Sequence, residues 1–340
     1  MKKPRPSLEH DTLPARYVSI LLDVCAEWGV TKEQLLAHSP LAALDLNAAD
    51  TRISFTELNW FVARALKLTQ QPSIGINAAA ALKLSTHGFF GFAILTSATI
   101  ADAVDLLEKF MFLQSGPFYI ESSIEVEMQL LNLNCHELPP TNLDAIYAEA
   151  ILLTIVYVAL DLLDEPDIHF EIHIKAPTPD YYAAIAASLP CPIRYSQCEN
   201  QLRFPVHYLN KKLKQANAAS FQLAKTQCEQ NLQELTTLDP LKNRVKALLS
   251  ADLLLPPDLV TLAGHCHLST RSLKRKLAEQ GTSYNQLLEE IRKEAALLLL
   301  SEQKLSVKEV AQRLGFSSTT NFSRAFKKWT GHTPRHYFRQ

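Results

Sequence analysis

Basic and small polar side chains that could contact nucleic acid recur on one face of a helix predicted near the end of the chain. Their spacing of three to four residues places them on the same side of an α-helix. An arginine can donate two hydrogen bonds to O6 and N7 of guanine, and a lysine can pair with phosphate. The alternative is a solvated basic surface without a ligand, as most charged runs are. The residues of this face and its flanks are Ser317, Thr320, Asn321, Arg324, Lys327 and Lys328.

The stretch from Leu305 to Phe338 supplies the elements that would position this face. Apolar residues at helical spacing predict a first helix that ends at Gly315, and Ser317 is the predicted N-cap of a second helix. The second helix carries an apolar stripe opposite its basic face, formed by Phe322, Ala325, Phe326 and Trp329. A short helix, a turn with glycine and a helix of this kind predict a helix-turn-helix.

A weaker copy of the same pattern lies about 50 residues upstream. Ser269 corresponds to Ser317 at a separation of 48 residues, and Arg275 corresponds to Arg324 at 49. In the copy, Leu273 and Leu277 are predicted to face inward, and the polar face comprises Arg271, Ser272, Lys274 and Arg275. The chain therefore contains a duplicated helix-turn-helix.

One long helix, Tyr284–Glu302, is predicted between the two copies. Nineteen residues in a helix span about 28 Å, and successive major grooves on one side of B-DNA lie roughly 34 Å apart. Such a helix can hold two recognition helices about one DNA turn apart. The duplication therefore favours a DNA-reading surface over a merely solvated one.

The charge of the 340-residue chain is divided between its two halves. The net charge is only −1, but residues 239–340 contain 17 Lys and Arg against 9 Asp and Glu. The remaining 17 basic and 26 acidic residues lie in residues 1–238. This division predicts nucleic-acid binding at one end only.

Residues 1–238 predict an α+β domain. Helices are expected at 17–28, 55–68 and 76–84, with Thr31 capping another short helix and Ser97 or Thr99 the next one. Strands are expected at 118–123, 126–135, 168–174 and 201–206, around an apolar helix at 142–163. The helix breaker TTLDP (236–240) coincides with the charge switch and marks the predicted domain boundary, 1–238 and 239–340.

No arrangement of residues argues for catalysis. Phosphate-binding glycine loops, GxSxG and HExxH are absent from the sequence. His169 and His173 could share one face of a strand, but no further ligand completes a metal site. Gly88 and Gly91 flank two phenylalanines, which suits close helix packing or a ligand. We therefore expect no enzyme activity, no catalytic residue, no metal and no cofactor.

The six cysteines have no short CxxC spacing, which indicates reduced thiols in a cytoplasmic protein. The N-terminal charges are not followed by an apolar stretch, so no signal peptide is predicted. The most apolar run, Ala150–Leu160, has 11 residues, is too short to cross a bilayer and is interpreted as a core helix.

Residues 239–340 resemble the DNA-binding domain of AraC/XylS transcription regulators. The matching residues are Ile291, Arg292 and Ala295–Leu298 in the long helix, VKEVAQRLGF, and NFSRAFKKWTGHTP. Leu277 departs from the usual Phe, which changes core volume only. Residues 13–210 resemble the arabinose-binding-like N-terminal domain of the ornithine-utilisation regulator branch, through LPARYVSILLDVCAEWGV, GFFGFAILTSATIADAVDLLEKF and CPIRYSQCENQLRFPVHYLNKKL. The second resemblance implies a sensing and dimerisation domain but does not identify the ligand.

The expected protein is a two-domain, effector-responsive transcription regulator, in which an α+β sensing domain precedes an all-α domain with two helix-turn-helix units. Its expected partners are promoter DNA, an unknown small-molecule effector, a second copy of the chain and, by family resemblance, RNA polymerase; activation is the expected direction. The alternatives are a ligand-independent dimeric regulator and a DNA-modifying enzyme with an attached helix-turn-helix. Effector-binding residues are unassigned, and a pocket is to be sought around His87, Phe89, Phe90 and Phe92.

Overall fold

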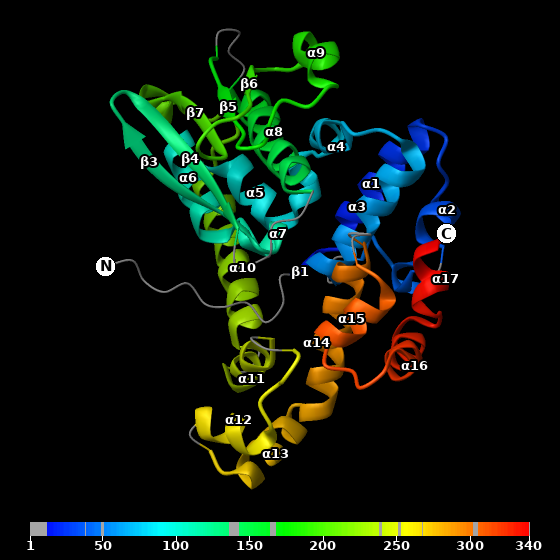
Figure 1. Ribbon diagram of the computed structural model, residues 1–340. Coiled ribbons are helices and arrows are strands. Elements are labelled where there is room, and N and C mark those ends of the chain that lie inside the picture. Colours follow the sequence, from blue (N-terminus) through cyan, green and yellow to red (C-terminus); the bar gives the residue numbers. More distant parts are fainter. Residues whose placement is uncertain are drawn as a thin grey trace.

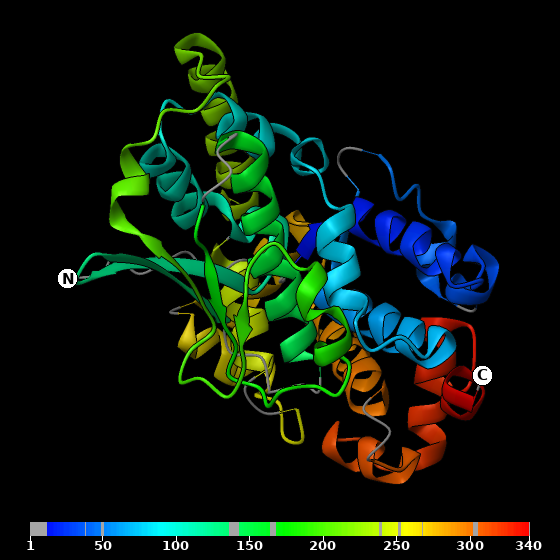
Figure 2. The same ribbon diagram turned by 90° about the horizontal axis from the view of Figure 1, so that it is seen from above.

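A computed structural model describes residues 12–37, 39–48, 51–135, 143–163, 168–237, 240–250, 253–266, 268–301 and 305–339. An α+β part lies at the top of Figure 1 and a helical part lies below it, as the sequence predicted. Figure 2 shows a β-hairpin, β3–β4, extending to one side of the upper part.

Helices make up most of the N-terminal part, and several begin at side-chain caps. Thr31, Ser54 and Thr99 each form a reciprocal capping box. The predicted caps at Thr31 and Thr99 are confirmed, and Ser97, which ends α5, is not the N-cap of α6. The α-helices are α1 (Arg16–Glu27), α2 (Lys32–Leu36), α3 (Phe55–Thr69), α4 (Ile74–Ala81), α5 (Gly88–Thr96), α6 (Ile100–Phe110), α7 (Phe112–Ser115), α8 (Asp144–Leu163), α9 (Tyr182–Ile185) and α10 (Ala218–Thr237). The 3-10 helices are η1 (Pro40–Ala43), η2 (Leu84–His87), η3 (Ala186–Ser188) and η4 (Val206–Asn210).

One five-stranded sheet has the order β3-β4-β7-β5-β6, in which only the β5–β6 pair is parallel. Its strands are β3 (Phe118–Glu125), β4 (Met128–Cys135), β5 (Glu171–His173), β6 (Ile193–Arg194) and β7 (Gln201–Pro205). A separate pair is formed by β1 (Thr12–Pro14) and β2 (Arg52–Ser54). All four predicted strands are present, but β5 is shorter than predicted and does not include His169. The shared strand face proposed for His169 and His173 is therefore wrong, and His173 pairs with Glu171 at 2.6 Å.

Helix α8 is the central helix of this part. Its 20 residues are enough to cross a membrane, which corrects the expectation from the 11-residue apolar run. Leu152, Leu153 and Val156 are fully buried, however, and half of the helix is inside the molecule. The expected core helix is confirmed. Gly75 of α4 allows the backbones to approach, because a Cβ there would clash with the carbonyl oxygen of Ile146 in α8.

The glycines before α6 have a packing role. A Cβ on Gly91 would clash with the carbonyl oxygen of Leu84, and Gly88 has a φ of +56°. The close approach of η2 and α5 therefore requires a glycine at position 91.

The C-terminal part is helical throughout its described residues. Its helices are α11 (Pro240–Ser250), α12 (Leu259–His265), α13 (Thr270–Glu279), α14 (Tyr284–Ser301), α15 (Val307–Arg313), α16 (Thr319–Thr330) and α17 (Pro334–Arg339). Helices α12 and α13 form the first helix-turn-helix unit, α15 and α16 form the second, and α14 joins them. The predicted order of elements is confirmed.

Two apolar cores hold these elements. The first unit has its own core, which includes Val245, Leu262, Leu273 and Leu287. The second unit and the last part of α14 belong instead to the core that extends through the N-terminal part. Helix α14 packs directly against α3, so the linker helix touches the upper part of the molecule.

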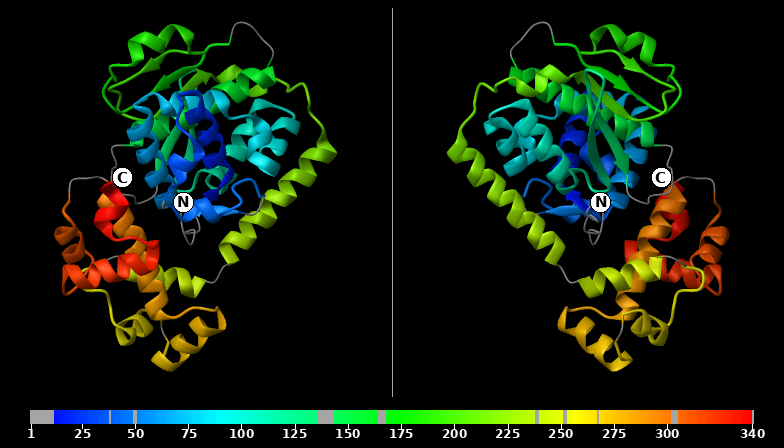
Figure 3. Two further views of the ribbon diagram at one scale, coloured as in Figure 1. Left: turned by 90° about the vertical axis from the view of Figure 1, so that its right-hand side faces the viewer. Right: turned by 90° about the vertical axis from the view of Figure 1, so that its left-hand side faces the viewer.

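Helix α10 descends from the N-terminal part toward α11 and is the long arm visible in Figure 3. It packs against α5, and Ala224 and Cys228 are buried. Leu213 lies before the helix and inside the core, whereas Leu223 of α10 is 70% exposed. The heptad-like spacing of Leu213 and Leu223 in the sequence, which could suggest a dimerisation helix, therefore does not form one apolar seam. The predicted boundary at 238/239 falls on two residues outside the described ones.

Candidate nucleic-acid interface

The second helix of each unit turns an apolar stripe inward and a polar face outward. Phe322 and Phe326 of α16 and Leu273 of α13 are fully buried, and Leu277 is almost so. Phe316, in the turn before α16, packs edge-on against Phe322 and Trp329, at centroid distances of 5.4 and 6.0 Å. These contacts fix the rotation of each helix about its axis, so the opposite face must point to solvent.

That outer face carries the predicted DNA-binding residues. All but one of them are exposed, and Ser272 is half-buried at the start of α13. The exposed ones are Arg271, Lys274, Arg275, Ser317, Thr320, Asn321, Arg324, Lys327 and Lys328. The structure thus brings each predicted set together on one helix surface, four residues on α13 and six on or just before α16.

The start of α16 differs by one residue from the prediction. Its N-cap is Ser318, whose Oγ accepts from the backbone N–H of Asn321 at 3.1 Å. In the first unit Ser269 caps α13 in the same way, through Ser272. The equivalent of Ser269 is therefore Ser318, at a separation of 49 residues, and the turn of the second unit is one residue longer.

Ser317 is the additional turn residue. Its Oγ accepts a hydrogen bond from Nδ2 of Asn321 at 3.0 Å, which orients the amide of Asn321 at the start of the outer face. The prediction that Ser317 caps the helix is wrong, but Ser317 does lie at the beginning of the polar surface.

Two of the basic side chains have acidic neighbours. Arg275 pairs with Glu279 at 3.0 Å, and Lys328 of α16 pairs with Glu289 of α14 at 3.0 Å. Within the described part of the chain, no ion pair involves Arg271, Lys274, Arg324 or Lys327. These four side chains are available for an external anion without breaking an existing pair.

The turn of the second unit is pressed against the first unit. Gly315 has a φ of +70°, and a Cβ there would lie 2.6 Å from the carbonyl oxygen of Leu254 and 2.7 Å from that of Leu253. Arg292 of α14 lies beside the same glycine, with its guanidinium carbon 5.0 Å from the centre of the Phe316 ring. Burial lowers the pKa of Arg292. Gly315 and Arg292 therefore hold the two units in one arrangement.

The sequence did not indicate that Glu289 orients Lys328 or that the Leu253–Leu254 backbone packs against Gly315. Glu289 faces α16 only after folding, and the two carbonyl groups carry no side-chain signal. Arg292 was noted only as part of the resemblance. Arg292 lies among the charged residues Glu289, Glu290, Lys293 and Glu294, so no local signal singled it out.

Comparisons with known proteins agree with this architecture. Residues 29–213 match the family described as the arabinose-binding domain of AraC transcription regulators, N-terminal, and residues 262–340 match a helix-turn-helix domain. The "Ornithine utilization regulator" of Pseudomonas aeruginosa is 31% identical over 99% of both chains. The chain belongs to the AraC family of transcription regulators.

Two other transcription regulators match along nearly the whole chain. An uncharacterised helix-turn-helix regulator of Mycobacterium tuberculosis is 26% identical over 96% of both chains. The crystal structure of the transcriptional regulator CdpR from Pseudomonas aeruginosa covers 100% of both chains with a TM-score of 0.50 at 20% identity, which is a likeness of fold. The protein is thus a transcription regulator with an AraC-type DNA-binding domain.

Proposed function

We propose that this AraC-family regulator binds promoter DNA with α13 and α16 in two successive major grooves, and that an effector controls it as an activator. One observation carries the proposal: two helices with exposed basic faces are joined by one uninterrupted helix of 18 residues. At 1.5 Å per residue α14 spans about 27 Å, which suits grooves roughly 34 Å apart when the recognition helices extend beyond its ends.

The proposed roles of the outer residues follow from their side chains. Arginine, asparagine and threonine can read base edges, and we assign this role to Arg271, Arg275, Thr320, Asn321 and Arg324. Lysines contribute affinity without sequence information through phosphates, and we assign this role to Lys274, Lys327 and Lys328. Ser272 and Ser317 support the starts of the two helices. The exposed pairs of Arg275 and Lys328 are worth only about 0–1 kcal/mol each, so phosphate or guanine can replace the carboxylate.

Replacing Arg324 tests the base-reading face. Arg324→Ala should cost about 1–3 kcal/mol of operator affinity and relax the base preference at one position. Lys327→Ala, three residues further along α16 and also free of an ion pair, is the matched control. It should weaken all DNA sequences equally and reduce the salt slope by about one. Titration of a randomised operator set with both variants measures the two effects. Unchanged operator affinity in Arg324→Ala would refute the assignment of this face.

The domain roles are part of the same proposal. Residues 239–340 would supply DNA binding, and residues 1–238 would sense the effector and form a homodimer. The match of residues 29–213 to the arabinose-binding domain supports a sensing role. Leu223 on α10 is 70% exposed and is one apolar contact available to a second copy. An activator of this kind would contact RNA polymerase in the cytoplasm. Sedimentation of the intact chain measures the dimer, and transcription in vitro measures the direction of control.

A ligand-independent dimeric regulator is the second candidate function. It would use the N-terminal part for dimerisation only. A compound that binds the native protein must raise its melting temperature, so a thermal-shift screen with metabolites separates the two candidates.

A further inference from the structure

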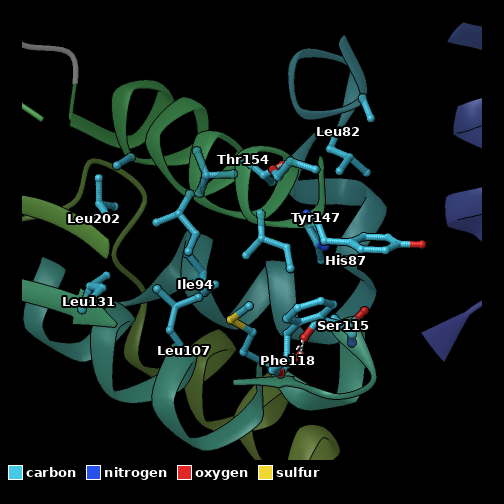
Figure 4. A pocket seen from close by; sticks show the side chains of 18 of the residues that line it. Leu82, His87, Ile94, Leu107, Ser115, Phe118, Leu131, Tyr147, Thr154 and Leu202 are labelled. Atoms are coloured by element: carbon cyan, nitrogen blue, oxygen red, sulfur yellow. Dashed lines mark hydrogen bonds between the residues drawn. The ribbon is translucent and has the colours of Figure 1, made fainter. Parts of the chain in front are cut away.

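The N-terminal domain contains a cavity of about 210 Å³ between its sheet and the surrounding helices. Helices α1, α3, α4, α5, α6 and α8 line it, together with strands of the sheet. Most of its lining is aliphatic or aromatic, as Ile94, Leu107, Leu131 and Leu202 show in Figure 4. A dry apolar cavity of about 150 Å³ accommodates benzene, so this cavity holds roughly eight or nine non-hydrogen atoms.

The segment in which a pocket was to be sought contributes two residues to the wall. His87 and Phe90 line the cavity, whereas Phe89 and Phe92 are 51% and 41% exposed and do not line it. His87 lies at the end of the cavity opposite strands β4 and β7 of the sheet (Figure 4). It is therefore the polar group that this segment presents to a ligand.

Several other polar side chains of the wall are already paired inside the protein. The hydroxyl of Tyr147 donates to Oδ1 of Asn59, and that of Thr154 donates to the carbonyl oxygen of Ala150, each at 2.7 Å. The hydroxyl of Ser115 donates to a main-chain carbonyl oxygen at 2.9 Å. These three groups have used their protons and offer little to a polar ligand.

Tyr17 determines the hydrogen-bonding state of His87. The hydroxyl of Tyr17 has one proton, which it donates to Oε1 of Gln114 at 3.1 Å. The same hydroxyl oxygen lies 2.8 Å from Nδ1 of His87, so Nδ1 carries a proton and donates it to this oxygen. Burial, with the charge of Arg16 adding to it, lowers the pKa of His87 to about 4, so the imidazole is neutral at pH 7. Nε2 of His87 is therefore an unprotonated acceptor.

This acceptor is open to a ligand. Among the described residues Nε2 of His87 has no hydrogen-bond partner, and the atom keeps accessible surface. A lone pair in such a place attracts an O–H donor and repels the lone pairs of a carboxylate. No Asp, Glu, Lys or Arg is among the described residues that line the cavity, so a charged ligand would lose its hydration without gaining a counter-charge.

We propose that this cavity binds a small uncharged ligand whose apolar body lies along the aliphatic wall and whose single hydroxyl group donates to Nε2 of His87. A sugar or a diamino acid fits poorly, because its other polar groups would meet carbon atoms in the wall. A fully apolar compound of the same size fits the wall but leaves the histidine acceptor without a partner. This inference rests on the proposed effector response, for which it names the ligand class.

Helix α3 links the cavity to the DNA-binding domain. It contributes Phe55, Leu58 and Val62 to the cavity wall and packs against α14, which joins the two helix-turn-helix units. A ligand that favours one position of α3 therefore shifts the population of positions that α14 adopts.

Binding to the intact protein tests the ligand class, with 1-octanol as the probe. Its isomer 1-methoxyheptane has no O–H group, and octanoate has the same chain with a negative charge. At pH 7, 1-octanol should raise the melting temperature and bind about tenfold more tightly than 1-methoxyheptane, because only the alcohol can donate to His87. Octanoate should bind at least about tenfold more weakly than 1-octanol. Equal affinities for the alcohol and the ether would overturn the hydroxyl contact, and octanoate binding as tight as that of 1-octanol would overturn the uncharged class.

Variants locate the site. His87→Leu should reduce the affinity for 1-octanol about tenfold, to that for the ether, and leave the affinity for the ether unchanged. Ala103→Leu fills part of the cavity and should abolish binding of both compounds, whereas Ala219→Leu adds the same atoms to the exposed face of α10 and should leave binding unchanged. Melting curves without ligand show whether each variant folds, and His87→Leu tests the contact by itself if Ala103→Leu does not fold. A preference for the alcohol that survives in His87→Leu would overturn the contact, and binding that survives in Ala103→Leu would overturn the location.

The same samples separate this proposal from the proposed function. 1-Octanol should change the operator affinity of the native protein and not that of Ala103→Leu. Binding of 1-octanol at the cavity with no change in operator affinity would support the ligand site and refute the effector response. A change in operator affinity with arabinose or ornithine, without binding of 1-octanol, would support the effector response and refute the ligand class.

Discussion

Replacing Gly315 by alanine tests how firmly the two helix-turn-helix units are joined. The substitution adds one methyl group at a φ of +70°, where an L-residue with a Cβ is strained by about 1–2 kcal/mol. The methyl carbon would also lie 2.6 and 2.7 Å from the carbonyl oxygens of Leu254 and Leu253. Real Cβ atoms do not approach backbone oxygens so closely, so the turn or the Leu253–Leu254 segment must move.

Substitutions at two other glycines of the same domain separate the cost of the positive φ from the cost of the close contact with Leu253 and Leu254. Gly331 has a φ of +80° and no atom within 4 Å of an added Cβ, so Gly331→Ala should cost only the conformational term of about 1 kcal/mol. Gly264, in helix α12, has an ordinary φ and open space, so Gly264→Ala should stabilise by up to about 1 kcal/mol. Gly315→Ala adds the cost of overpacking to the conformational term, about 3 kcal/mol in total.

Urea unfolding measures these differences, and Trp329 of α16 reports on the second unit because it packs against Phe316. Operator affinity should fall for Gly315→Ala even at urea concentrations too low to unfold the protein, since the two recognition helices would no longer keep their arrangement. It should stay unchanged for Gly264→Ala. A Gly315→Ala protein no less stable than Gly331→Ala would show that the close approach to Leu253 and Leu254 does not constrain the domain.

Two further predictions concern local hydrogen bonds and pH. Ser318→Ala should destabilise α16 by about 1 kcal/mol through loss of its cap, whereas Ser317→Ala should cost less than half of this; equal losses in thermal unfolding would contradict the assignment of Ser318 as the cap. The low pKa of His87, about 4, means that the folded protein binds fewer protons than the unfolded chain between pH 4 and 6.5. Stability should therefore fall as the pH is lowered through this window, by at most about 2 kcal/mol between pH 7 and pH 5. His87→Gln should remove this part of the pH dependence, and an unchanged profile would show that His87 is not desolvated.

The helical half was predictable because its signals are local. The apolar residues of α13 and α16 recur within one helix, so Phe322, Phe326, Leu273 and Leu277 could be assigned to the inside from their spacing alone. The basic outer faces then followed. The sequence did not show whether Ser317 or Ser318 is the N-cap of α16, because either serine can cap a helix. The hydrogen bond from the backbone N–H of Asn321 to Oγ of Ser318 identifies Ser318 as the cap.

The N-terminal half was less predictable because its decisive contacts join distant segments. β1 and β2 have three residues each and pair across about forty positions, so neither carries a periodic signal. The cavity gathers Tyr17, His87 and Gln114 from three separate elements. Alternating residues at 168–174 predicted a longer strand than β5, because the pattern specifies a face but not how far a neighbouring strand extends.

The contacts of α14 determine what an effector can change. Both units are fastened to this helix, the first through its core and the second through Arg292 and the pair of Lys328 with Glu289. Helix α11 is also fastened to it, by the pair of Lys246 with Glu290 at 2.8 Å. Helix α14 contains neither glycine nor proline, so it resists bending between the units. A displacement of α3 therefore acts on both recognition helices together. On the proposed mechanism, the effector changes how the whole domain is presented to DNA, while the distance between the two grooves that it reads stays the same.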